Sequence, residues 1–142
     1  MSFVAVGIDG SEAAAHALRF AIEEAKMRQL PLRVVAAWEV PAAEYIGGAL
    51  LPNPDLADLA RENADAALVA AVEQARQAGV EAEGVEVEGH PGRVLVEQAQ
   101  GATLLVVGSR GRGGFASLVL GSVSQAVAHH APCALAIVRG RN

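Results

Sequence analysis

The stretch LLVVGSRGRGGFASLVLGS, residues 104–122, determines how the rest of the chain is interpreted. Its first four residues are all aliphatic, which is typical of a buried parallel strand. At Gly108 the run breaks into glycine, serine and arginine, and a helix-like pattern follows. Glycine lets a ligand approach the backbone closely, so that several N–H groups can converge on phosphate oxygens. The stretch therefore predicts an anion-binding turn between a strand and a helix, with a plain surface loop as the alternative.

Two common phosphate motifs do not account for this turn. A P-loop requires a lysine after its last glycine, and Lys26 is the only lysine in the chain. Gly111-x-Gly113-x-x-Ala116 matches the loose dinucleotide fingerprint, but no Asp or Glu follows Glu97, so the ribose-binding acid is missing. A different phosphate-binding motif is therefore needed to explain the turn.

The spacing Gly108-x-x-Gly111, nine residues, Gly121-Ser122 resembles the signature G-2x-G-9x-G-[ST] of the ATP-binding branch of the universal stress protein family. Residues 4–21, VAVGIDGSEAAAHALRFA, also resemble the opening strand and first helix of that family. The resemblance implies one domain over residues 1–142, with an adenine nucleotide α-hydrolase-like fold. It further implies ATP as ligand, with Mg²⁺, a nucleotide-dependent role in regulation or stress response, and a homodimer.

The resemblance also implies which residues bind the nucleotide. Gly7 and Ala37 fall near adenine-facing positions, and Asp9 falls where relatives contact the ribose or a divalent metal; capping of the first helix is its alternative role. Serine hydroxyls at 122 and 124 could add donors to phosphate. Three departures from the family pattern are Ala36, Thr103 and Ala134. The full candidate set is Gly7, Asp9, Ala37, Gly108, Ser109, Arg110, Gly111, Arg112, Gly113, Gly114, Gly121, Ser122, Val123 and Ser124.

No catalytic constellation accompanies this candidate site. The sequence contains neither a Gly-x-Ser-x-Gly elbow nor a His-Glu-x-x-His metal motif, and its four histidines fit structural roles in helices and turns. We therefore expect at most slow ATP hydrolysis. Two other functions stay open: a hydrolase acting on the nucleotide α-phosphate, and a structural dimer that binds no nucleotide.

Composition narrows the class of protein. The chain has 142 residues, 52% of them hydrophobic but only 4% aromatic, which predicts one domain with a core of small and branched aliphatic side chains. The net charge of −5 and the lack of a long basic stripe argue against nucleic-acid binding. No apolar run is long enough to span a membrane and no leader is apparent, so we expect a cytoplasmic protein. The single cysteine, Cys133, is expected in the core.

Strand and helix patterns alternate along the chain. Strands are predicted at 3–8, 32–38, 81–88, 104–107 and 134–138. Helices are predicted from 12 to between 28 and 30, and at 56–77, 90–100 and 117–130, with residues 39–55 as a long connection. This alternation predicts an α/β fold, a doubly wound five-stranded parallel sheet in the order 3-2-1-4-5 with helices on both faces. In that order the winding reverses between the first and fourth strands, so Asp9 and Gly108 would face one ligand crevice. The strand at 134–139 would form a free edge for the homodimer.

Overall fold

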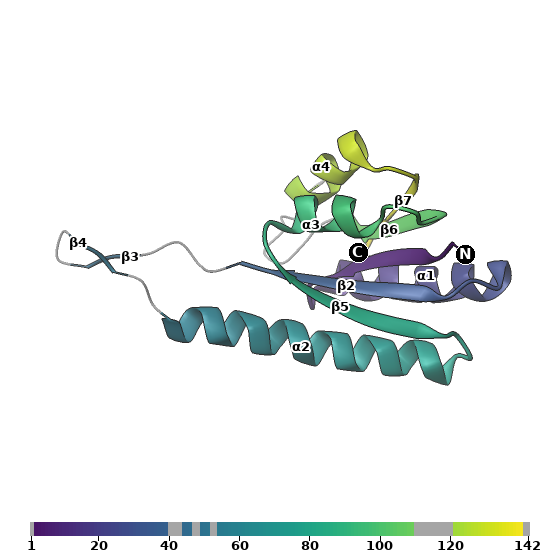
Figure 1. Ribbon diagram of the computed structural model, residues 1–142, viewed down its shortest axis with the longest axis horizontal. Coiled ribbons are helices and arrows are strands. Elements are labelled where there is room, and N and C mark those ends of the chain that lie inside the picture. The colour runs from purple at the N-terminus through teal and green to yellow at the C-terminus, as the bar shows by residue number, and fades with distance from the viewer. Residues whose placement is uncertain (1, 40–43, 47–48, 52–53, 110–120, 141–142) are drawn as a thin grey trace.

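The computed structural model describes residues 2–39, 44–46, 49–51, 54–109 and 121–140. Its centre is a five-stranded parallel sheet in the order β5-β2-β1-β6-β7 (Figure 1). Taken in chain order, these strands have the order 3-2-1-4-5, which confirms the predicted fold class. The strands are β1 (Val4–Ile8), β2 (Leu32–Trp38), β5 (Ala82–Glu88), β6 (Leu104–Gly108) and β7 (Ala134–Val138).

Helices cover both faces of this sheet. The helices α1 (Glu12–Arg28) and α2 (Pro54–Gln77) lie on one face, and α3 (Pro91–Gln98) and α4 (Ser122–His130) lie on the other (Figure 1). Because side chains alternate along a strand, each strand contributes to two cores. Val4 and Val6 pack toward α1 and α2, whereas Ala5 and Val107 pack toward α3 and α4. The fold thus has three layers.

Local signals set the helix ends. The hydroxyl of Ser11 accepts a hydrogen bond from the N–H of Ala14 at 3.1 Å, so Ser11 is the N-cap of α1, as predicted. The helix ends at Gln29, a non-glycine residue with a positive φ of 57°. The turn after α2 contains Gly79 at φ 84°, a conformation that glycine adopts without steric cost. No helix in the described residues is both long and apolar enough to cross a bilayer.

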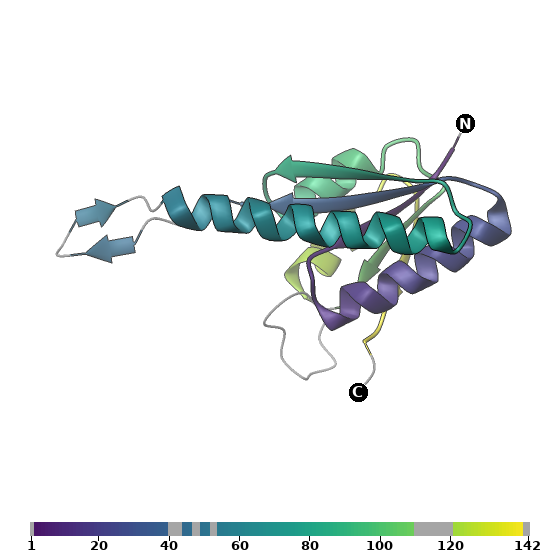
Figure 2. The same cartoon turned by 90° about the horizontal axis from the view of Figure 1, so that it is seen from below.

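The prediction that residues 39–55 form a long connection with neither strand nor helix is wrong in part. This segment contains two short antiparallel strands, β3 (Glu44–Ile46) and β4 (Ala49–Leu51), which form a hairpin beyond the N-terminal end of α2 (Figure 2). Three residues are too few to show a period of two, and the surrounding glycines and prolines indicate a loop. The helix α2 also begins two residues earlier than predicted, at Pro54, because proline is favoured at the first helical position.

Two other helix boundaries differ from prediction. Helix α4 begins at Ser122 instead of near residue 117, because Gly121 has extended backbone angles (φ −66°, ψ 165°) and serves as its N-cap. Residues 117–120 lie outside the described residues. Helix α3 ends at Gln98, two residues before the predicted end.

Candidate functional site

A small pocket lies where the carboxyl ends of β1, β2 and β6 meet the N-terminal ends of α3 and α4. It has a volume of about 80 Å³. A single water molecule needs only about 10–15 Å³ measured in this way, so the pocket can hold a larger group. Its lining consists of Gly7, Ile8, Asp9, Ala14, Val35, Ala37, Pro91, Leu95, Val107, Gly108, Val123 and Ser124. The pocket lies at the point where the winding of the sheet reverses, as the strand order predicts.

The pocket brings together part of the predicted site. Six of the candidate residues line it: Gly7, Asp9, Ala37, Gly108, Val123 and Ser124. Gly121 and Ser122 form the start of α4, and Ser109 follows β6 and is buried. The remaining candidates, Arg110, Gly111, Arg112, Gly113 and Gly114, lie outside the described residues.

The two glycines at the strand ends allow helices to pack closely. A Cβ at Gly108 would lie 2.8 Å from the carbonyl carbon of Ala13 in α1 and 2.9 Å from its Cβ. A Cβ at Gly7 would lie 2.7 and 2.8 Å from the methyl carbons of Leu95 in α3. Neither glycine is among the described residues with positive φ. At Gly108, where the obstructing atoms include backbone, the close approach of α1 requires glycine; at Gly7 the obstructing atoms end a flexible side chain, so a larger residue would displace Leu95.

Backbone hydrogen bonds join the two ends of the glycine-rich turn. The N–H of Gly121 donates to the carbonyl of Ser109 at 2.8 Å, and the N–H of Ser109 donates to the carbonyl of Val138 at 2.8 Å. These bonds fix the start of α4 beside the ends of β6 and β7. They also mean that the amides of Ser109 and Gly121 already have acceptors, so an anion would be bound by other donors.

The two serines of α4 occupy different environments. Ser124 is 2% exposed, and its hydroxyl donates to the carbonyl of Gly108 at 2.6 Å. Its proton therefore holds α4 to β6, instead of pointing to a ligand as the sequence suggested. Ser122 is exposed, and no side chain caps α4. The helix N-terminus beside the pocket thus presents Ser122 and the positive end of the helix dipole.

Asp9 precedes α1 but is not its N-cap, so the capping alternative for this residue is wrong and its contact with a ligand stays a prediction. Its Oδ1 accepts a hydrogen bond from the N–H of Ser11 at 2.9 Å, while Ser11 itself caps α1. The carboxylate is exposed and lines the pocket. No three His, Cys, Asp or Glu side chains gather as a metal site in the described parts of the chain. Because phosphate-bound Mg²⁺ commonly uses only one or two carboxylates, Asp9 still fits such an ion.

Several lining residues were not found from the sequence. Pro91 and Leu95 of α3, and Val35 and Val107 at the strand ends, supply the apolar walls of the pocket. Their apolar character, in the strand runs for Val35 and Val107 and on α3 for Leu95, was the available signal, but it fits a core equally well. His90 caps α3, since its Nδ1 accepts from the N–H of Gly92 at 3.1 Å, so the predicted structural role is confirmed.

Cys133, expected in the core, is half-buried. It packs against the core between the sheet and α3 and α4, and burial raises the pKa of its thiol. A raised pKa keeps the thiol protonated, which makes it a poor nucleophile. This agrees with the structural role predicted from the sequence.

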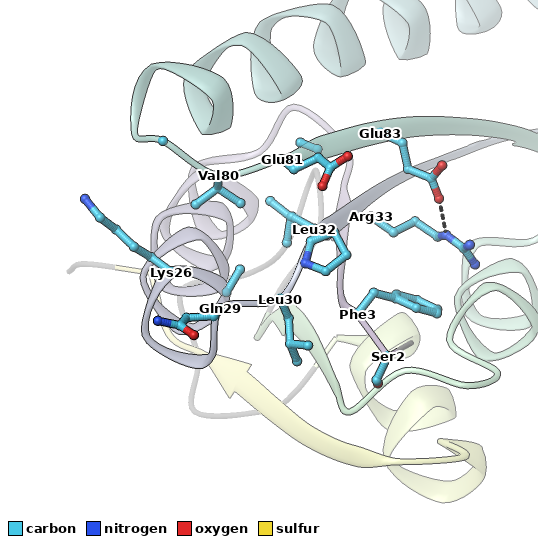
Figure 3. Close-up of a pocket in the computed structure, with 14 residues that line it drawn as sticks. Ser2, Phe3, Lys26, Gln29, Leu30, Leu32, Arg33, Val80, Glu81 and Glu83 are labelled. Carbon is cyan, nitrogen blue, oxygen red and sulfur yellow. Dashed lines mark hydrogen bonds and ion pairs between the residues drawn. The ribbon is translucent and has the colours of Figure 1, made fainter.

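Larger hollows lie elsewhere on the surface. One of about 720 Å³ lies at the amino ends of β1, β2 and β5, where Arg33 pairs with Glu83 at 2.8 Å and lies over the ring of Phe3 (Figure 3). Open parallel sheets bind ligands at their carboxyl ends, so this hollow is not our candidate. A groove of about 420 Å³ under α2 shares Ile8, Asp9 and Ala37 with the small pocket. The candidate site therefore opens on both sides of Asp9.

Comparison with known proteins identifies the family. The model of the universal stress protein family matches residues 3–139. The chain belongs to the universal stress protein family. Among curated members, it is 36% identical over 137 residues to universal stress protein Rv2623 of Mycobacterium tuberculosis, covering 96% of this chain and 44% of that protein. It is 33% identical over 142 residues to universal stress protein YxiE of Bacillus subtilis, covering 94% and 96%. The chain thus spans less than half the length of the mycobacterial relative and nearly all of YxiE.

A solved structure of a family member carries a ligand. The universal stress protein in complex with cAMP is 28% identical to this chain, has a TM-score of 0.74, and is matched over 99% of this chain and 98% of that one.

Proposed function

We propose that this chain binds ATP, together with Mg²⁺, at the carboxyl ends of β1 and β6. We further propose that it acts as a regulatory module whose stability or choice of partner follows nucleotide occupancy. The observation that carries the proposal is the meeting of an apolar pocket with the N-terminus of α4 at Gly121-Ser122. The ligand of the cAMP-bound relative is also an adenine nucleotide.

The apolar part of the pocket suits the adenine ring. Val35, Leu95 and Val107 offer aliphatic walls, and Ala37 and Gly7 present little side chain. Ligand pockets are typically apolar with a few polar groups that fix orientation. In this arrangement backbone groups at the ends of β1 and β2 would orient the base.

The N-terminus of α4 suits the phosphates. Helix N-termini attract anions through unpaired N–H groups and the helix dipole. No acidic side chain follows Glu97 in the sequence, so residues 98–142 add no side-chain carboxylate that would repel phosphate. Asp9, on the other side of the pocket, would hold the ribose hydroxyls or a phosphate-bound Mg²⁺. The signature glycines at 111 and 121 and the arginines at 110 and 112 remain predicted ligand contacts.

The same pocket offers little for catalysis of hydrolysis. Asp9 is the only titratable side chain among its described lining residues. Fast transfer of a phosphoryl group needs a residue that positions water and cations that stabilise the transition state. We therefore expect turnover that is slow at most and yields ADP and phosphate. AMP and pyrophosphate as products would favour the α-phosphate hydrolase instead.

The test is a substitution at the helix N-terminus. We expect Ser122→Asp to lower ATP affinity about tenfold or more, because a carboxylate would face the phosphates. Binding of adenosine, which has no phosphate, should be unchanged. Isothermal titration of ligand-stripped protein measures both affinities. An acid in the first turn of a helix does not disturb folding, so the variant should remain native.

The matched control is Ser122→Asn, which changes size similarly but adds no charge. Its ATP affinity should stay within about threefold of the original, since the asparagine amide keeps a neutral hydrogen-bond donor at this position. Unaltered ATP affinity in Ser122→Asp, or equal losses for ATP and adenosine, would contradict the proposed phosphate position. Absence of any nucleotide binding would support the structural-dimer alternative.

A further inference from the structure

The outer edge of β5 is an unpaired edge of the sheet. Within the described residues, β5 pairs only with β2. The N–H of Leu32 donates to the carbonyl of Glu81 and the N–H of Gly89 donates to the carbonyl of Trp38, both at 2.8 Å. Backbone groups of residues 81 and 89 therefore face β2. The N–H and C=O groups of successive residues point to opposite sides of a strand. The backbone groups of Ala82, Gly84 and Glu86 therefore face away from β2, toward the side on which another strand could pair.

A groove of about 520 Å³ runs between this edge and α2, which lies alongside β5 (Figures 1 and 2). Its floor is aliphatic: Leu68 is buried, and Val69 is 72% exposed, an unusual exposure for a large apolar side chain. Gly84 keeps the groove open to the backbone, because it has no side chain and lies against Val72. The complete lining is Asp65, Leu68, Val69, Val72, Glu73, Arg76, Gly84 and Glu86.

The charge around the groove is mainly negative. Glu81, Glu83 and Glu88 are exposed on and beside β5, and Asp65 and Glu73 are exposed on α2. Of three nearby arginines, Arg33 pairs with Glu83 at 2.8 Å and Arg61 pairs with Glu86 at 3.1 Å, whereas Arg76 lines the groove itself, so acidic side chains still outnumber basic ones. An edge of this charge repels the same edge of a second copy and attracts a basic segment.

We propose that the edge of β5 and the α2 groove bind an extended, basic segment of a partner protein by strand addition. Main-chain hydrogen bonds to Gly84 and its neighbours would provide affinity, and alternate side chains would provide specificity. Side chains on the α2 side would be aliphatic and pack on Val69 and Val72. Those on the opposite side, where Glu81 and Glu83 are exposed, would be lysine or arginine.

The test uses a fluorescent peptide of about nine residues in which valine and lysine alternate. Anisotropy titrations compare the original protein with the double variant Asp65→Lys, Val69→Lys. We expect affinity to fall about tenfold or more, because the variant removes the apolar contact and places two cations beside a basic peptide. The matched control, Glu23→Lys with Met27→Lys on α1, makes the same charge change at exposed positions and should bind within about twofold.

Two modified peptides separate strand addition from charge attraction alone. A peptide with glutamate in place of lysine should not bind. A peptide N-methylated at alternate amides keeps its charge but cannot pair as a strand, so it should also lose about tenfold in affinity. Undiminished binding of the methylated peptide, or equal weakening by the groove and control variants, would overturn the proposal. Melting temperatures of both variants, measured in parallel, exclude loss of folding as the cause.

Discussion

Gly108 lies where α1 crosses the end of β6. The backbone of Ala13 occupies the space that a side chain would need. Ser124 similarly serves the fold, since its hydroxyl bonds to the carbonyl of Gly108. The identities of Gly108 and Ser124 beside the candidate site therefore depend on the packing of α1 and α4 as well as on any ligand.

Gly108→Ala should destabilise the protein by about 1–3 kcal/mol, because backbone atoms cannot move aside for the added methyl group. Gly140→Ala is the matched control: its Cβ would lie 3.6 Å from the Cα and Cβ of the same Ala13, an ordinary contact distance. That variant should change stability by no more than about 1 kcal/mol, and an increase is expected from the reduced freedom of the unfolded chain. Urea unfolding measures both. Equal effects would refute the steric explanation.

The secondary structure elements differ in how well the sequence pattern predicted them. Long periodic segments predicted the sheet strands and α2, because burial on one or both sides leaves a repeated pattern over many residues. The β3–β4 hairpin was missed because three-residue strands carry no period. The start of α4 was misplaced because Ser117 to Leu120 resemble helix, whereas Gly121 adopts the extended backbone of an N-cap. Element boundaries thus depend on single-residue backbone angles that periodicity does not reveal.

Some features of the candidate site could likewise be predicted from the sequence, and others could not. The strand order predicted a crevice at the carboxyl ends of β1 and β6, and a pocket lies there; that it binds a ligand stays a prediction. Pro91 and Leu95 could not be assigned to it, because an apolar side chain in a pocket wall and one in a core look alike in sequence. The hydrogen bond from Ser124 to Gly108 joins residues 16 positions apart, and no local pattern predicts it.

Helix α2 is held to the sheet by a small polar network. Oε1 of Glu86 accepts from the indole N–H of Trp38 at 3.0 Å and lies 3.1 Å from Nε of Arg61 on α2. Glu86→Ala should cost about 1–3 kcal/mol, since the half-buried indole loses its acceptor. Arg61→Ala should cost about 1 kcal/mol or less, because that arginine is largely exposed. Denaturant titrations quantify both.

Trp38 is the only tryptophan, so its fluorescence reports directly on this network. A shift of the emission maximum is expected in Glu86→Ala and not in Arg61→Ala. If both variants shift the emission equally, the arginine contributes as much as the carboxylate to the environment of the indole, which contradicts this expectation.

The whole molecule has two different sheet edges. The β5 edge is acidic, whereas β7 carries no charge from Ala134 to Val138, and its last four residues are half-buried. The sequence predicted a homodimer through this uncharged edge, and the contrast with β5 supports that choice, because like charges oppose pairing of two β5 edges. The dimer itself remains a prediction.

The substitution Ala134→Asp, at an exposed position of β7, tests the predicted homodimer. We expect the dimer dissociation constant to rise about tenfold or more, because each partner would bring a carboxylate to an apolar interface. Sedimentation velocity over a range of concentrations measures the constant. Ala70→Asp, at an exposed position of α2, adds the same charge away from β7 and should leave it unchanged. A monomer in the original protein at all concentrations would exclude the dimer.

The contact between Gly108 and Ala13 has a consequence for how family signatures are used. A member that had lost its ligand would still need a small residue at this position to keep α1 in place. The first glycine of the signature is therefore weak evidence for nucleotide binding when a new sequence is assigned. More diagnostic weight belongs to Ser122, whose exposed side chain at the helix N-terminus makes no described contact that would preserve it for folding alone.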